Sequence, residues 1–184
     1  MEADKLKDYS GPFTQGISWD DFSRETLVQA LGTYAGLFPA IDGFWYLSVK
    51  DRFGEEPAFD CDFWVWDKYF RYETKRLTKL FGITGNDVET YFKVFQLSPV
   101  VSTQGFKLDL FSKQHGVLKV HRCPTLEALI KEGEGREQRF CKRVEQKMLE
   151  MQAHAINPDI TVNGLCMPPE TIGGEICCEW EFKL

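Results

Sequence analysis

The sequence lacks the features that mark membrane, secreted and nucleic-acid-binding chains. No apolar run approaches the roughly 20 residues that cross a bilayer, and the N-terminus has no apolar signal core. Basic residues are in deficit: 22 Lys and Arg stand against 28 Asp and Glu, which gives a net charge of −6. An acidic chain suits neither nucleic acid nor an anionic membrane surface. We therefore expect a soluble, cytoplasmic protein with no nucleic-acid and no membrane partner.

Paired cysteine motifs are also missing. None of the six cysteines forms a Cys-x-x-Cys pair, the strong signal of a zinc ribbon. The 184-residue chain is too large to depend on disulfides, so reduced thiols are expected. Apolar residues make up 43 % and charged residues 27 %, a balance that excludes disorder and suits one globular domain.

Helical patterning fills the first half of the chain, after a loose lead-in over residues 1–18. Gly36 is expected to interrupt the first helix, and Pro39 suits the first turn of the second. Further helices are predicted over about 56–81 and 87–95. The apolar stripe of the second helix comprises Ile41, Trp45, Val49 and Phe53.

After Pro99 the apolar period changes to two, which is typical of half-buried strands. The strands are predicted over residues 106–110, 117–122, 160–166 and 176–182, with a helix beginning at Pro124 between the two pairs. This strand–strand–helix–strand–strand order predicts an antiparallel sheet covered on one face. The fold class is therefore α+β. A single domain over 19–184 would join a helical half, 19–98, to a sheet-and-helix half, 103–184.

Aromatic residues are concentrated in the helical half. Twelve of the 26 aromatic side chains fall between Phe38 and Tyr72. Two helices cannot bury twelve rings against each other. The surplus must pack on the sheet, line a small-molecule pocket, or form the interface of a homodimer.

Carboxylates interrupt this aromatic segment. A carboxylate among aromatic rings has a raised pKa and can serve as a general acid or base, so Asp42 and Asp62 are catalytic candidates. The alternatives are structural: Asp42 suits the first turn of a helix, and Glu73 can pair with Arg76. The candidate ligand-binding residues share helical lines with these acids and are Trp45, Tyr46, Trp66, Tyr69 and Glu73.

Four thiols are predicted to converge beneath the covering helix. Strand parity and the helix stripe place Cys123, Cys141, Cys166 and Cys178 there, a set that could hold zinc or another thiolate-bound metal. The alternative is that each is a small buried hydrophobe. Cys123 could also act as a nucleophile, because a helix N-terminus lowers a thiol pKa and His121 is close enough to be its base.

The aromatic and cysteine motifs together resemble a known group. Residues 41–54 (IDGFWYLSVKDRFG), 62–66 (DFWVW) and 178–182 (CEWEF) resemble an uncharacterised group of prokaryotic cytosolic proteins, over roughly residues 20–184. That group is similar to the L-2-amino-thiazoline-4-carboxylic acid hydrolase-like proteins. This resemblance implies the opening of a small heterocycle by water.

The second half also resembles the 4-vinyl reductase domain, a small-molecule-binding module related to haem–nitric oxide sensors. The resemblance depends on Cys141, Cys166 and Cys178, and it implies N-terminal helices on a four-stranded sheet with a covering helix. We therefore expect a small-molecule-binding domain with an aromatic, acid-lined pocket. The alternatives are a hydrolase of a small cyclic amide or thiazoline-like compound and a cysteine-thiolate metal protein.

Overall fold

The computed structural model describes residues 5–184. Its helices are α1 (Arg24–Phe53), α2 (Glu55–Phe81), α3 (Val88–Phe95), α4 (Pro124–Glu132) and α5 (Gln146–His154). Its strands are β1 (Gly105–Ser112), β2 (His115–Arg122), β3 (Thr161–Cys166) and β4 (Cys178–Lys183). Short 3₁₀ turns are η1 (Trp19–Asp21), η2 (Pro99–Val101) and η3 (Arg136–Gln138), and η4 (Cys141–Glu145) is a π-helical turn.

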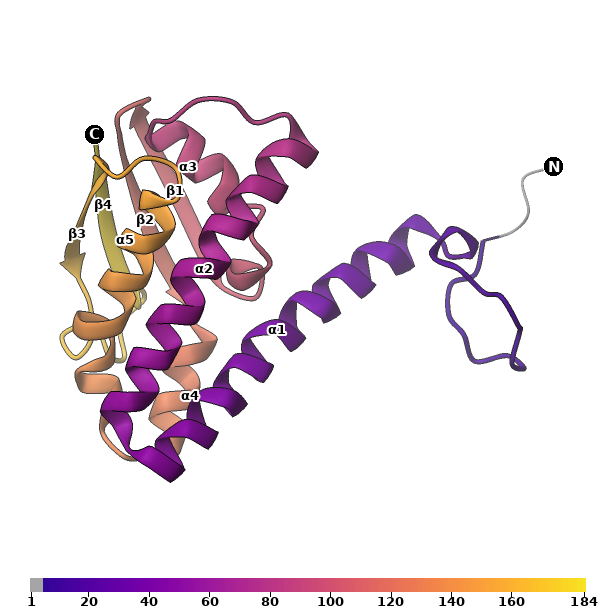
Figure 1. The fold of residues 1–184 in the computed structure, drawn as a ribbon, viewed down its shortest axis with the longest axis horizontal. Coiled ribbons are helices and arrows are strands. Elements are labelled where there is room, and N and C mark those ends of the chain that lie inside the picture. Colours follow the sequence, from indigo (N-terminus) through magenta and orange to yellow (C-terminus); the bar gives the residue numbers. More distant parts are fainter. Residues whose placement is uncertain (1–4) are drawn as a thin grey trace.

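The four strands form one antiparallel sheet in the order β1-β2-β4-β3. The predicted α+β class is confirmed, with helices in the N-terminal half and strands in the C-terminal half (Figure 1). Alternation along β4 places Cys178, Trp180 and Phe182 on the buried face. Period-two alternation of this kind follows directly from the strand backbone.

The main core lies between this face and helices α3 and α5. Trp180 and Phe182 are fully buried, and the ring of Phe182 lies 4.8 Å from that of Tyr91 on α3. Leu118 of β2 pairs with Trp180 and extends the same apolar layer. Burying such side chains contributes about 1.5–3 kcal/mol each, which makes this layer the main stabilising element.

The opposite face of the sheet is charged. Lys119 lies 3.3 Å from Asp109 on β1 and 3.5 Å from Glu179 on β4, which forms a ladder of ion pairs across three strands. His115 and Glu181 form a similar cross-strand pair at 3.0 Å. This face therefore needs no covering layer.

The first two predicted helices are one continuous helix, α1, of 30 residues. Ser23 caps its N-terminus by accepting a hydrogen bond from the Thr26 amide, and Gly36 and Pro39 both lie in its interior. The predicted break is wrong. Gly36 faces the side chain of Thr103, and an added Cβ would lie 3.7 Å from it, at ordinary contact distance.

Helix α1 packs on α2 only near its C-terminal end, and its N-terminal half extends away from the body of the molecule (Figure 1). Gly54, at φ 92°, joins the two helices. The stripe predicted to be buried is largely on the surface, since Ile41, Trp45 and Phe53 are 67 %, 67 % and 68 % exposed. Residues 5–18 of the lead-in lie at the far tip of α1, where Leu6 bridges to Phe22.

Within residues 5–184, none of the helices combines the length and the apolar character needed to cross a bilayer.

Candidate functional site

Two acids face each other where α1 and α2 converge. Asp42 of α1 and Asp62 of α2 share a hydrogen bond between their carboxyl groups. The indole Nε1 of Trp66, one turn after Asp62, donates a hydrogen bond of 3.1 Å to Asp62 Oδ1. Both predicted acids are therefore brought together, and they form a pair that the sequence pattern did not specify.

Burial raises the pKa of both carboxyl groups. For Asp62 the pKa rises to about 7, first because of burial and second because of the negative charge of Asp42. The Trp66 hydrogen bond opposes this rise. Because two carboxylates this close disfavour double ionisation, the pair retains a shared proton to a higher pH than an isolated aspartate does.

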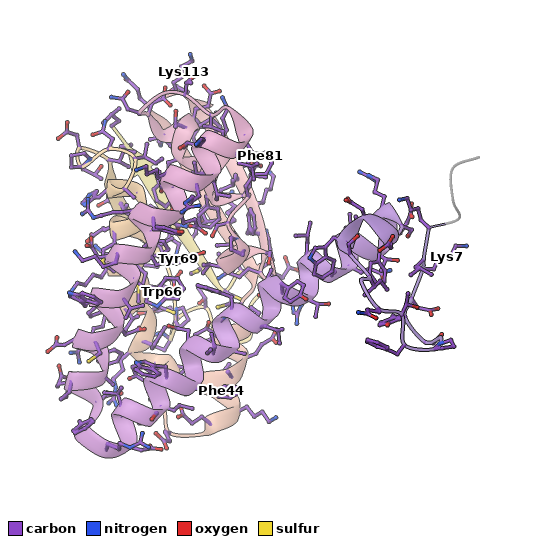
Figure 2. All side chains as sticks on the ribbon, turned by 45° about the vertical axis from the view of Figure 1, so that its right-hand side comes forward. Lys7, Phe44, Trp66, Tyr69, Phe81 and Lys113 are labelled. Atoms are coloured by element: carbon purple, nitrogen blue, oxygen red, sulfur yellow. The ribbon has the colours of Figure 1, made fainter. Side chains whose placement is uncertain are left out.

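Aromatic rings form the wall around the pair. The Phe38 ring lies 4.8 Å from Tyr69 and 6.0 Å from Trp66, and Trp66 and Tyr69 meet edge to face at 5.3 Å. Figure 2 labels Trp66 and Tyr69 midway along α2. These rings and the acid pair line an outer pocket of about 270 Å³, with Trp45 and Tyr46 on its α1 side. Four of the five predicted ligand-binding residues therefore lie on one pocket.

Glu73, the fifth, lies behind this wall rather than on it. It accepts hydrogen bonds from Tyr69 Oη at 2.9 Å and from Ser98 Oγ at 2.7 Å, and it is almost completely buried. Burial raises its pKa, and these two hydrogen bonds oppose the rise. Glu73 positions Tyr69 and ties α2 to the segment before η2, so the structure does not place it on the outer pocket with the other four residues.

A larger space, the main cavity, opens on the other side of the acid pair. Its volume is about 1010 Å³, and its walls come from α1, α2, α4, α5 and the segment after α3. Asp42, Tyr46, Asp62 and Trp66 line both the outer pocket and the main cavity. The Tyr46 side chain is buried, and its hydroxyl has no hydrogen-bond partner within the described residues. The acid pair and Tyr46 therefore form a polar patch in a mostly apolar enclosure.

A third acid, Glu145, lines the main cavity from the π-helical turn η4. Burial raises its pKa to about 7. The pKa values of the thiols of Cys123, Cys141 and Cys178 are raised first by burial and second by the negative charge of Glu145. Sequence reasoning missed this residue, although an acid next to Val144 on an apolar helix stripe was a usable signal.

Cys123 caps α4 as predicted, because its sulfur accepts the Leu126 amide at 3.4 Å. Its expected activation is wrong. Burial and the charge of Glu145 raise the pKa of Cys123 to about 11, so the thiol stays protonated at neutral pH. The His121 ring lies 3.4 Å from the Glu175 carbonyl oxygen, on an exposed stretch.

The four predicted metal ligands are not assembled. A bulge between Gly164 and Cys166 places Cys166 opposite Glu179, and its sulfur lies 3.9 Å from the Glu179 carboxylate. The bulge reverses the parity that would have put Cys166 beside Cys178. Among residues 5–184, no group of three or more His, Cys, Asp or Glu side chains is arranged to hold a metal ion.

Fold and site together define an α+β protein whose helical layers enclose an acidic cavity walled by aromatic rings. The chain belongs to a family of unknown function (DUF6125), whose model matches residues 20–184. That match includes Asp42, Asp62 and Glu145. No curated protein and no solved structure matches the chain.

Proposed function

We propose that this protein binds a small organic molecule in the main cavity, against the acid pair of Asp42 and Asp62. The observation that carries the proposal is the pair itself: two half-buried carboxyl groups, hydrogen-bonded to each other, on the shared wall of two cavities. Ligand sites are concave and largely apolar, with a few convergent polar groups and perturbed pKa values. The main cavity, at about 1010 Å³, has the volume for a molecule of more than one ring.

Thermal-shift titration with indole, benzamide and 2-amino-thiazoline-4-carboxylate tests this proposal. We expect at least one probe to raise Tm for the native chain, and Asp42→Asn to weaken that shift. Asp51→Asn, on an exposed position of the same helix, is the matched control and should leave it unchanged. Identical shifts for native protein and Asp42→Asn, or no shift with any probe, would count against binding at the pair.

The shared proton supports a second candidate function, hydrolysis of a small cyclic amide or thiazoline. A pair that holds one proton can supply it from one carboxyl group while the other accepts a proton from water. The thiazoline hydrolase resemblance is in keeping with this reaction type. Hydrolysis of 2-amino-thiazoline-4-carboxylate, measured by chromatography, should require the protein. Asp62→Asn should abolish this hydrolysis without loss of fold. Binding of this compound without its hydrolysis would contradict the second function and leave ligand binding as the proposed function.

We further propose that two copies associate through α1. Seven large apolar side chains between residues 28 and 45 are more than half exposed: Val28, Leu31, Tyr34, Leu37, Ile41, Phe44 and Trp45, of which Ile41 and Trp45 also line the outer pocket. Together they expose on the order of 800–900 Å² at ordinary side-chain areas. This exceeds the roughly 300–600 Å² patch of a typical monomer and reaches the roughly 800 Å² per partner of a standard interface.

The spacing on α1 indicates how the copies would pair. Phe38 packs on Tyr69 of α2, but before it Leu27, Leu31 and Tyr34 recur at intervals of four and three, on the half of α1 that extends from the body. This is the seam pattern of a coiled coil, on a helix about 45 Å long. Light scattering after size exclusion should give twice the 21.3 kDa chain mass. Leu31→Glu should give the monomer, with Leu110→Glu on β1 as the control; a native monomer at 100 µM would contradict the pairing.

The free thiols fit the proposed cytoplasmic location. All six cysteines are unpaired in the described structure, and Cys61 is exposed. Reduced, accessible thiols persist in a reducing compartment.

A further inference from the structure

Glu145 is held by an unusual turn of backbone. It is the last residue of η4, a π-helical turn that leads directly into α5. Single π turns are rare and often occur at functional sites, because the extra residue changes where the neighbouring side chains point. Here the turn lets Val144 stay in the core while Glu145 lines the main cavity.

The Glu145 carboxylate has no partner from the protein. Among residues 5–184, no side chain donates a hydrogen bond to it or forms an ion pair with it, and its neighbours include the thiols of Cys123, Cys141 and Cys178. Glu73 differs, because it is buried and accepts hydrogen bonds from Tyr69 and Ser98. Glu145 is half-buried and lines the main cavity, so its carboxylate is accessible there to a ligand that carries a hydrogen-bond donor.

Acidic side chains outnumber basic side chains around the main cavity. Arg136, on its wall, is engaged by Glu132 at 2.9 Å and lies 3.4 Å from Glu55. Arg122 pairs with Glu127 at 3.2 Å. The described lining thus offers no cation to Glu145 or to the acid pair, and its basic side chains already neutralise other acids.

The apolar part of the lining suits an organic cation. Aromatic rings on the wall include Tyr46, Trp66, Phe70, Phe95 and Phe140. Such faces attract a cation through the ring quadrupole and cover an apolar body equally well. A metal ion, in contrast, would find too few oxygen or sulfur ligands, since no suitable group is present among residues 5–184.

We propose that the main cavity selects an organic cation, a protonated amine or amidine on an apolar body, whose charged head binds Glu145. This rests on the proposed binding function and names the class of ligand. The amine would donate to the carboxylate that the protein leaves unpartnered, and the aromatic wall would contact the rest of the molecule. Asp42 and Asp62 lie on the same cavity, which gives a second polar contact for a longer cation.

Calorimetric titration with three matched probes tests the class: 4-phenylbutylamine, 4-phenylbutan-1-ol and 4-phenylbutyrate. A charge-assisted hydrogen bond contributes about 1.5–3 kcal/mol, so the amine should bind about tenfold tighter or more than the alcohol, and the carboxylate most weakly. Glu145→Gln should remove the preference for the amine and leave alcohol binding unchanged. Glu150→Gln, on α5 and hydrogen-bonded to Gln146, is the control that should retain it.

The outcomes separate the two proposals. Equal binding of amine and alcohol by the native chain would overturn the cation class and leave small-molecule binding intact. An amine preference that persists in Glu145→Gln would overturn the role of Glu145. Absence of binding for all three probes would count against both proposals. The native-protein comparison needs no variant, so the test stands even if Glu145→Gln is poorly folded.

Discussion

Asp42 on α1 and Asp62 on α2 are joined carboxyl to carboxyl by a hydrogen bond that links the two helices. Only a protonated carboxyl group can donate that hydrogen bond. The junction of the two helices is therefore coupled to one proton. pH and the packing of α1 on α2 therefore act on the same pair.

The pair should make stability fall as pH rises. The pKa of Asp62 is about 7 in the folded chain and about 3.9 when unfolded. The unfolded state therefore loses its proton first, and the stability present below pH 4 is lost as pH rises through about 7. Asp62→Asn removes this loss. Relative to the native chain, the variant should gain about 1–3 kcal/mol of unfolding free energy between pH 4 and pH 8, after screening of the partly exposed pair.

Urea unfolding followed by circular dichroism at both pH values measures that difference. Asp67, on the next turn of α2, forms an ion pair with Arg71. Asp67→Asn is the control, and its unfolding free energy should fall between pH 4 and 7 as that of the native chain does. An Asp62→Asn curve parallel to that of the native chain would mean that the two carboxyl groups ionise independently.

Trp66 is expected to support the pair through its indole. Trp66→Phe removes the 3.1 Å hydrogen bond to Asp62 and should cost about 1 kcal/mol of unfolding free energy at pH 8. Because this hydrogen bond lowers the Asp62 pKa, its loss should raise the pKa further. Carbonyl-carbon NMR titration of the Asp side chains measures the shift. Trp64→Phe, at an exposed position two residues earlier, should leave the Asp62 titration unchanged.

The sheet could be predicted from the sequence because its signal is local. In β4 the apolar Cys178, Trp180 and Phe182 alternate with Glu179 and Glu181, and the strand backbone alone dictates that these sets face opposite ways. The continuous α1 could not be predicted in the same way. Gly36 and Pro39 are local breakers, and their tolerance depends on packing against η2 and Thr103, which lie more than 60 residues away.

The sequence indicated which residues belong to the candidate site but not how they are arranged in space. Asp42, Asp62 and Trp66 could be selected because acids among aromatic rings are unusual, yet their contact depends on the angle that Gly54 sets between two helices. The predicted position of Cys166 is wrong for a different reason. Alternation along a strand predicts the face of each residue only until a bulge adds a residue, and a bulge has no strong sequence signal. Glu145 could have been selected from its place beside Val144 on an apolar stripe, but the π-helical turn that holds it could not.

The thiols should differ sharply in reactivity. Cys61 is exposed on α2, whereas Cys123, with a pKa raised to about 11, and the buried Cys141 and Cys178 carry little thiolate at neutral pH. Reaction with Ellman's reagent at pH 7.5 should show a fast phase that Cys61→Ser removes. In urea all six thiols should react. A fast phase that persists in Cys61→Ser and disappears in Cys123→Ser would restore an activated thiol at the α4 N-terminus.

Two glycine substitutions should have opposite effects on stability because their surroundings differ. At Gly116 of β2, an added Cβ would lie 2.5 Å from Phe92 Cε2 and 3.1 Å from the Asp109 carbonyl oxygen. Phe92 is a buried ring of the main core, so Gly116→Ala should cost about 1–3 kcal/mol through overpacking. At Gly32 of α1, no atom lies within 4 Å of an added Cβ. Gly32→Ala should therefore stabilise by about 0.5–1 kcal/mol through helix propensity. Urea midpoints measure both, and a destabilised Gly32→Ala would mean that a second copy of the chain contacts α1 at that position.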